Sequence, residues 1–163
     1  MGIGVGSVCH TKLVTGVGNT ALSCLLDCAE TLDAYSFPMQ LVLDGGVSEV
    51  GDIAKALVAG ADIIISGSMF AGTDEAAGEI LLTDGITGPK AKKYRGSASL
   101  PSYEVQGKVA TWRAPEGTSI AVPLKGSAID VLNNINGGLR SSLSYVGAFN
   151  LDEFKAKAKF QYL

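Results

Sequence analysis

The sequence is poor in positive charge and in aromatic side chains, and both shortages argue against nucleic acid as a partner. It has 13 Lys and Arg residues against 16 Asp and Glu residues, and aromatic residues make up only 7% of the 163 positions. A protein that binds nucleic acid needs a basic surface for the phosphates, often with aromatic rings on which bases stack. With a net charge of −3, we expect no nucleic-acid partner.

Long apolar runs and cysteines are also scarce. No apolar run approaches the ~20 residues that cross a bilayer, and the N-terminus lacks a charged segment followed by an apolar one. We therefore expect no membrane association and a cytoplasmic location. The three cysteines are Cys9, Cys24 and Cys28. Their odd number, without a secretion signal, favours free thiols over a disulfide framework.

Apolar residues are plentiful enough for one ordinary domain. They make up 47% of the chain, and charged residues make up 18%. No repeat, low-complexity tract or linker divides the sequence, so residues 1–163 are interpreted as a single domain.

Strand and helix patterns alternate in the first part of the chain. Apolar residues at helical spacing predict a helix over residues 19–35, with Asn19 as a possible cap and with Cys24 and Cys28 packed in the core. A strand from Met39 to Asp44 is followed by a helix over 50–61 and a second strand that starts at Asp62. Continuous apolar strands joined by helices indicate an α/β fold with a parallel sheet.

The second part of the chain is less regular. Residues 79–96 are interpreted as a hairpin, 97–117 as a long surface loop and 119–126 as a short strand. Residues 127–147 have helical periodicity, which we expect to be interrupted at Gly137 and Gly138. A small charged helix and an extended aromatic tail end the chain.

Small and polar residues follow each predicted parallel strand. The first strand ends at Asp44, Gly45 and Gly46, and the second ends at Gly67 and Ser68. Loops after the carboxyl ends of such strands hold ligands, and glycines there let backbone amides approach a phosphate. Each feature also has a purely structural interpretation, in which Asp44 is a turn residue and Gly67-Ser68 begins a helix.

The first eighteen residues, MGIGVGSVCHTKLVTGVG, surround Cys9 with glycines. Such a loop could bring a thiolate close to a flat substrate. The alternative is a glycine-rich terminus with an incidental cysteine. The one histidine, His10, stands beside Cys9, and a lone histidine is more often structural than catalytic.

Six stretches of the sequence, taken in order, resemble the catalytic barrel shared by inosine monophosphate dehydrogenase and guanosine monophosphate reductase. They are GIGVGSVCHTKLVTGVG, LVLDGGVSEVGDIAKALVAGAD, ISGSMFAGTDEAAGE, YRGSAS, VPLKG and GGLRSSLSYVGA. The resemblance implies the C-terminal part of a TIM (β/α)8 barrel, which is incomplete as given. A complete barrel takes ~250 residues, and these residues correspond to the loop after the sixth strand and to the seventh and eighth strands.

The resemblance also implies roles for residues near the two strand ends. Cys9 would attack C2 of a purine nucleotide, and the backbone carbonyls of Gly4, Gly6 and Cys9 would hold a monovalent cation such as K⁺. The remaining binding roles are implied for several positions: phosphate contacts from Ser7, Gly46, Gly67 and Ser68, ribose contacts from Asp44, and base contacts from Gly96 and Ser97.

The choice between the two enzymes depends on the segment before residue 118. The dehydrogenase carries a flap with an Arg-Tyr pair that activates water, and this chain has no arginine between Ser97 and Trp112. In the reductase, an arginine that contacts the base and a glutamate that acts with a threonine correspond to Arg113, Glu116 and Thr11. The last two would protonate departing ammonia. The structural alternatives are a surface charge for Arg113, a turn residue for Glu116 and a helix cap for Thr11.

Three functions follow from this resemblance. The first is NADPH-dependent reductive deamination of GMP to IMP, and the second is oxidation of IMP to XMP with NAD. The third is a non-catalytic nucleotide-binding or subunit-interaction piece. We expect a homotetramer, or a requirement for the N-terminal half of the barrel.

Departures from the family pattern occur at several positions: Val5, His10, Lys12, Pro115 and Thr118.

Overall fold

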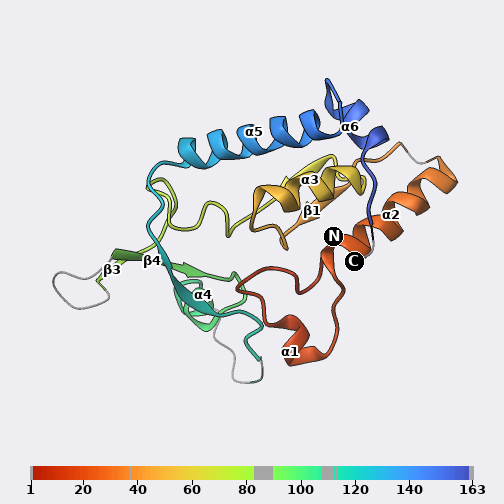
Figure 1. The fold of residues 1–163 in the computed structure, drawn as a ribbon. Coiled ribbons are helices and arrows are strands. Elements are labelled where there is room, and N and C mark those ends of the chain that lie inside the picture. The colour runs from red at the N-terminus through yellow and green to blue at the C-terminus, as the bar shows by residue number, and fades with distance from the viewer. Residues whose placement is uncertain (1, 37, 83–89, 108–111, 113, 162–163) are drawn as a thin grey trace.

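The chain forms an α/β fold in which helices pack beside a parallel pair of strands, and an antiparallel sheet lies next to this unit (Figure 1). The computed structural model describes residues 2–36, 38–82, 90–107, 112 and 114–161. The helices are α1 (Thr11–Thr15), α2 (Ala21–Tyr35), α3 (Val50–Val58), α4 (Leu100–Val105), α5 (Ala128–Tyr145) and α6 (Leu151–Lys157). The strands are β1 (Val42–Asp44), β2 (Ile63–Ile65), β3 (Ile80–Leu82), β4 (Lys90–Arg95) and β5 (Ser119–Pro123).

The predicted strand–helix–strand unit is confirmed. Strands β1 and β2 are parallel, with Val42 opposite Ile63 and Asp44 opposite Ile65, and α3 connects them. The principal core lies around this unit; its buried residues are Leu25, Leu43, Val47, Ala56, Ala59, Ala61 and Met69. Because both strands end at the same edge, the turns that follow them meet there.

Helix α2 confirms the helix predicted near residue 20, with two corrections. Its N-cap is Thr20 rather than Asn19; the Asn19 side chain instead accepts a hydrogen bond from the Thr20 amide at 3.0 Å. Cys24 and Cys28 are half-buried thiols rather than core residues, because α2 buries one narrow stripe around Leu25. Partial burial, together with the neighbouring Cys24, raises the pKa of Cys28.

The hairpin and the short strand are confirmed as the sheet β3–β4–β5, which is antiparallel throughout. The prediction of a surface loop over 97–117 is wrong in part, because helix α4 occupies its beginning. Ser102 and Tyr103 are buried on this helix. Pro101, at the second position of α4, made this segment resemble a loop. Proline is also tolerated in the first turn of a helix, where its missing amide is not needed for a hydrogen bond.

Helix α5 runs without the interruption that we predicted at Gly137 and Gly138. It lies along α3 (Figure 1), and a Cβ atom at Gly138 would lie 2.4 Å from Cγ1 of Val50. The glycine therefore permits close helix packing rather than breaking the helix. The first turn of α5 is held by the Glu75 carboxylate, which accepts hydrogen bonds from the Ala128 amide at 2.7 Å and from the Ser127 hydroxyl at 2.9 Å.

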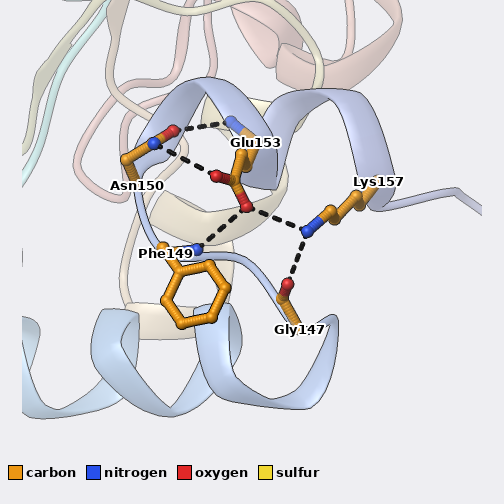
Figure 2. A network of polar contacts seen from close by, with 5 residues as sticks. All are labelled: Gly147, Phe149, Asn150, Glu153 and Lys157. Carbon is orange, nitrogen blue, oxygen red and sulfur yellow. Dashed lines mark hydrogen bonds and ion pairs between the residues drawn. The ribbon is translucent and has the colours of Figure 1, made fainter.

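A polar network fixes the corner between α5 and α6, as Figure 2 shows. The Glu153 carboxylate pairs with the Lys157 ammonium at 2.9 Å and accepts a hydrogen bond from the Phe149 amide at 3.2 Å. The Asn150 side chain caps α6 by accepting from the Glu153 amide at 2.8 Å. The Lys157 ammonium also donates to the Gly147 carbonyl, so one lysine joins the end of α5 to the body of α6. This confirms the small charged helix predicted at the end of the chain.

A search of the described residues finds no helix that is both long and apolar enough to cross a membrane.

Candidate functional site

A cavity of about 370 Å³ opens at the carboxyl ends of β1 and β2. Four separate segments line it: the glycine-rich loop around Cys9, the turn after β1, the turn after β2, and the end of β4 with the residues that follow. Glu116 and Gly117 complete the lining. Segments that are far apart in the sequence therefore share one opening at the edge where ligands bind in parallel α/β folds.

Backbone pairing fixes the cysteine loop against the segment that carries Glu116. The His10 amide donates to the Glu116 carbonyl at 2.6 Å, and the Thr118 amide donates to the Val8 carbonyl at 2.9 Å. Between these two bonds, Cys9 lies opposite Gly117 in an antiparallel bridge. The cysteine and the glutamate are held together by main-chain groups, so this pairing does not use their side chains.

The segment that carries Glu116 is also paired along its other edge, with residues 96–98. The Glu116 amide donates to the Ala98 carbonyl at 3.1 Å, and the Gly96 amide donates to the Thr118 carbonyl at 2.9 Å. A Cβ atom at Gly117 would lie 3.0 Å from the Ser99 amide nitrogen. Residues 116–118 thus form the middle of a small three-stranded arrangement, and glycine at position 117 allows the close approach.

The Cys9 thiol has a hydroxyl neighbour in Thr11. Cys9 Sγ lies 3.2 Å from Thr11 Oγ1, and either group can donate this hydrogen bond. The amide of Cys9 donates to the Gly6 carbonyl at 3.0 Å, so the loop turns tightly just before the cysteine. His10 uses its backbone amide in the pairing with Glu116, and no described side-chain hydrogen bond links its imidazole to Cys9.

The turns after β1 and β2 are joined to each other. The hydroxyls of Ser66 and Ser68 both donate to the Val47 carbonyl, at 2.6 Å and 3.0 Å, and the Gly45 amide donates to the Ile65 carbonyl at 2.9 Å. The Ser68 hydroxyl proton, which we had expected to face a phosphate, is therefore used within the protein. Gly46 adopts φ +73°, a left-handed conformation that glycine adopts without strain.

Backbone amides remain available beside this cavity. Within the part of the chain that the structure describes, no hydrogen bond is recorded to the amides of Gly46, Gly67 and Ser68, and all three residues line the cavity. The Asp44 side chain lines the same cavity and is exposed. Unpaired amides and one carboxylate at a single opening provide donors for an anion and an acceptor for hydroxyl groups.

Sequence reasoning missed Tyr94 and Arg95, which also line the cavity. A Cβ atom at Gly67 would lie 2.5 Å from the Tyr94 hydroxyl oxygen, so the phenol reaches the turn after β2. Both residues belong to the quoted stretch YRGSAS. Both residues stand at the end of the predicted hairpin, just before Gly96 and Ser97, and this position could have identified them as part of the site.

The structure gathers nearly all the predicted site residues. Those that line the cavity are Gly4, Gly6, Ser7, Cys9, Asp44, Gly46, Gly67, Ser68, Gly96, Ser97 and Glu116. Thr11 reaches the site through its contact with Cys9. The Gly96 amide already serves the Thr118 carbonyl. Arg113 lies outside the described residues. Among the residues that are described, no group of three or more His, Cys, Asp or Glu side chains could hold a metal ion.

Comparison with known proteins decides the family. The family model for the IMP dehydrogenase / GMP reductase domain matches residues 1–163. The chain belongs to the IMP dehydrogenase / GMP reductase family. This confirms the resemblance drawn from the six stretches of sequence.

Named relatives of this family member include both enzymes. The chain is 41% identical over 160 residues to GMP reductase of Shewanella pealeana and 41% identical over 161 residues to human GMP reductase 2; each match covers 98% of this chain and 45% of the relative. It is 39% identical over 175 residues to inosine-5′-monophosphate dehydrogenase of Methanocaldococcus jannaschii, covering 98% of this chain and 34% of the relative. The chain therefore spans less than half the length of these relatives.

A solved structure of the family has the same fold. GMP reductase from Trypanosoma brucei, crystallised as a variant in complex with guanosine 5′-monophosphate, superposes with a TM-score of 0.85 at 37% identity. The match covers 97% of this chain and 32% of the other.

Proposed function

We propose that this chain carries the nucleotide-binding turns and the nucleophile of a purine nucleotide oxidoreductase that converts GMP to IMP with NADPH. The observation that carries the proposal is the backbone pairing that places Cys9 and Glu116 beside the turns after β1 and β2. The relatives named GMP reductase support the same substrate.

The nucleotide would be held mainly by the two strand-end turns. The Asp44 carboxylate would accept hydrogen bonds from both ribose hydroxyls. The amides of Gly46, Gly67 and Ser68 would donate to the phosphate, as would the Ser7 and Tyr94 hydroxyls. Charge-assisted hydrogen bonds of this kind are roughly twice as strong as neutral ones. Gly96, Ser97 and Arg113 would contact the base.

In the chemical step, the Cys9 thiolate would attack C2 of the purine and form a C–S bond. The bond from C2 to the exocyclic nitrogen would then break, and Glu116 with Thr11 would supply the proton that the leaving ammonia requires. NADPH would supply a hydride to C2. The C–S bond would break last, which returns the thiolate and releases IMP.

A monovalent cation such as K⁺ would bind the carbonyls of Gly4, Gly6 and Cys9. Carbonyl oxygens are suitable ligands for a hard cation, and all three residues belong to one turn that lines the cavity. The Gly6 carbonyl already accepts a hydrogen bond from the Cys9 amide, but a carbonyl oxygen has a second lone pair. The cation would brace the loop that carries the nucleophile.

The rest of the fold is proposed to be a (β/α)8 barrel, of which this chain supplies the C-terminal part. The parallel sheet described here has two strands, and Ile63 and Ile65 on β2 are 47% and 49% exposed. Apolar side chains at a sheet edge need a covering layer, which the N-terminal half of the barrel would provide. Association into a homotetramer is proposed on the same grounds of exposed apolar surface.

The test is an assay at the nicotinamide absorbance with two substrate pairs. Oxidation of NADPH with GMP, accompanied by release of ammonia, is the expected result. Turnover of IMP with NAD instead would indicate the dehydrogenase, which the relative from Methanocaldococcus jannaschii makes the second candidate. Binding of GMP without turnover of either pair would indicate a non-catalytic nucleotide-binding piece.

A further inference from the structure

Two lysines hold the segment that follows β2, and neither has a role in the chemistry proposed above. The Lys125 ammonium donates to the Ser68 carbonyl at 2.8 Å and to the Met69 carbonyl at 3.1 Å. The Lys92 ammonium donates to the carbonyls of Thr73 and Asp74, at 2.8 Å and 3.2 Å. The two ends of one short segment are thus bound by two positive charges.

No described carboxylate forms a salt bridge with either ammonium; the salt bridges among the described residues involve other lysines. Lys92 is only 7% exposed, and a buried charge is costly unless it is paired or fully hydrogen-bonded. Backbone carbonyls, which carry partial negative charge, take the place of a carboxylate at both lysines. The Ala128 amide and, to a lesser degree, the Lys92 ammonium lower the pKa of Glu75, so that carboxylate partly offsets the charge of Lys92. The Lys125 ammonium, in contrast, binds the turn that carries the unpaired amides.

The Lys125 contact lies at the carbonyl end of a single helical turn. The Ala71 amide donates to the Gly67 carbonyl at 2.8 Å, which closes that turn. In such a turn the carbonyls point toward one end and the amides toward the other. Lys125 binds carbonyls, and the amides of Gly67 and Ser68 belong to the opposite end, where both residues line the cavity.

We propose that Lys125 is a positioning residue for recognition of the substrate's phosphate. By fixing the carbonyls of Ser68 and Met69, it aims the amides of Gly67 and Ser68 at the cavity and adds positive charge behind them. This inference rests on the proposed nucleotide site, which it deepens by assigning selectivity for a 5′-monophosphate to a residue outside the cavity lining.

The Lys125 side chain can be removed with little direct damage to the fold. Its residue is exposed, and the backbone contacts on either side of the side chain are independent of it: the Lys125 amide donates to the Gly72 carbonyl, and the Asp74 amide donates to the Gly126 carbonyl. Lys92, in contrast, is buried, and its substitution would perturb packing as well as charge. Lys125 is therefore the residue to test.

The test compares Lys125→Met, Lys125→Arg and Lys55→Met in the full native chain that carries this sequence. Lys55 is the matched control, because it is an exposed lysine on α3 whose ion pair is with Asp52. Lys125→Met is expected to weaken GMP binding by about 10-fold or more. Guanosine, which lacks the phosphate, should bind as it does to the parent protein. Lys125→Arg should restore most of the GMP affinity, and Lys55→Met should change neither ligand.

The readouts separate positioning from a general structural role. A raised KM for GMP with an unchanged kcat supports the proposal, whereas equal losses for GMP and guanosine, or no loss for either, would overturn it. Amide hydrogen exchange gives an answer that does not need the substrate: in Lys125→Met, exchange should accelerate at the amides of Met69 and Ala71, which donate hydrogen bonds to Ser66 and Gly67, and not in α3. If the parent chain fails to bind GMP, the proposed function fails, and the exchange result alone decides whether Lys125 holds the turn.

Discussion

The corner between α5 and α6 and the pairing between the Cys9 loop and Glu116 are both fixed contacts, but they are made from different atoms. The corner depends on side chains, with Glu153 joined to Lys157 and Asn150 (Figure 2). The pairing at the site depends on main-chain hydrogen bonds. This difference implies that side chains at the corner contribute to local stability, whereas side chains at the site can change without loss of the local fold.

The largest effect is expected for Cys9→Ala. Turnover should be abolished, because no other cysteine lines the cavity within the described residues. The thermal midpoint and GMP affinity should stay close to the parent values, because the bridge to Gly117 uses the backbone. Cys24→Ala on α2 is the control and should remain active. A Cys9 variant that melts early would show that the thiol supports the fold and would break the comparison.

Glu116→Gln should slow the reaction by roughly 100-fold or more if the carboxyl protonates the leaving ammonia. The backbone contacts of residue 116 to His10 and Ala98 remain possible in this variant, so GMP should bind as before. Single-turnover kinetics with detection of ammonia measures the step. Glu104→Gln on α4 changes the same group outside the cavity and should have no effect; full activity in the Glu116 variant would contradict the assignment.

Asp44→Ala should weaken nucleotide binding by about 2 kcal/mol, roughly thirtyfold in Kd, through loss of a charged acceptor for the ribose hydroxyls. Because this is a binding contact, kcat at saturating GMP should fall much less. Titration calorimetry measures the affinity, and Asp33→Ala on α2 supplies a control of equal charge. A 2′-deoxy nucleotide should show a smaller difference between parent and variant, and an undiminished difference would indicate that Asp44 does not contact the ribose.

The smallest effect is expected for Glu153→Gln, which tests the side-chain contacts at the corner between α5 and α6. The Lys157 ammonium and the Phe149 amide lower the pKa of Glu153. The ionised form therefore stabilises the fold at pH values above the ordinary carboxyl pKa, and this contribution disappears as the pH falls through the lowered value. The thermal midpoint of Glu153→Gln should lie slightly below the parent near neutral pH and converge with it in acid, while kcat is unchanged.

The elements that are built from local pattern were predictable, and those that depend on distant contacts were not. The continuous apolar strands around Leu43 and Ile64 predicted the parallel unit and the edge where ligands bind. Gly138 looked like a helix breaker, because its contact with Val50 lies on another helix and leaves no trace in the local sequence. Helix α4 was missed for a similar reason: Tyr103 is buried by tertiary contacts, and its short segment has little helical periodicity.

The candidate site was predicted mainly through the resemblance to a family, since spacing alone left Cys9 open to a structural interpretation. Geometry adds what the motifs could not provide. It shows that the Ser68 hydroxyl is engaged by Val47 and that Tyr94 reaches the turn after β2. The antiparallel pairing of Cys9 with Gly117 joins segments from opposite parts of the chain, which no local pattern encodes.

That same pairing has a consequence for the order in which the chain folds. Val8 and Thr118, joined by a main-chain hydrogen bond, are separated by most of the sequence, so this contact closes a very long loop. Closing such a loop costs chain entropy before the contact itself can offset that cost, and non-local contacts of this kind slow folding. Strands β1 and β2, linked through α3, can form from neighbouring residues. We therefore expect Cys9 and Glu116 to meet late, after the parallel unit has formed; a chain stalled at that stage would contain the turns after β1 and β2 without the pairing that brings Cys9 to Glu116.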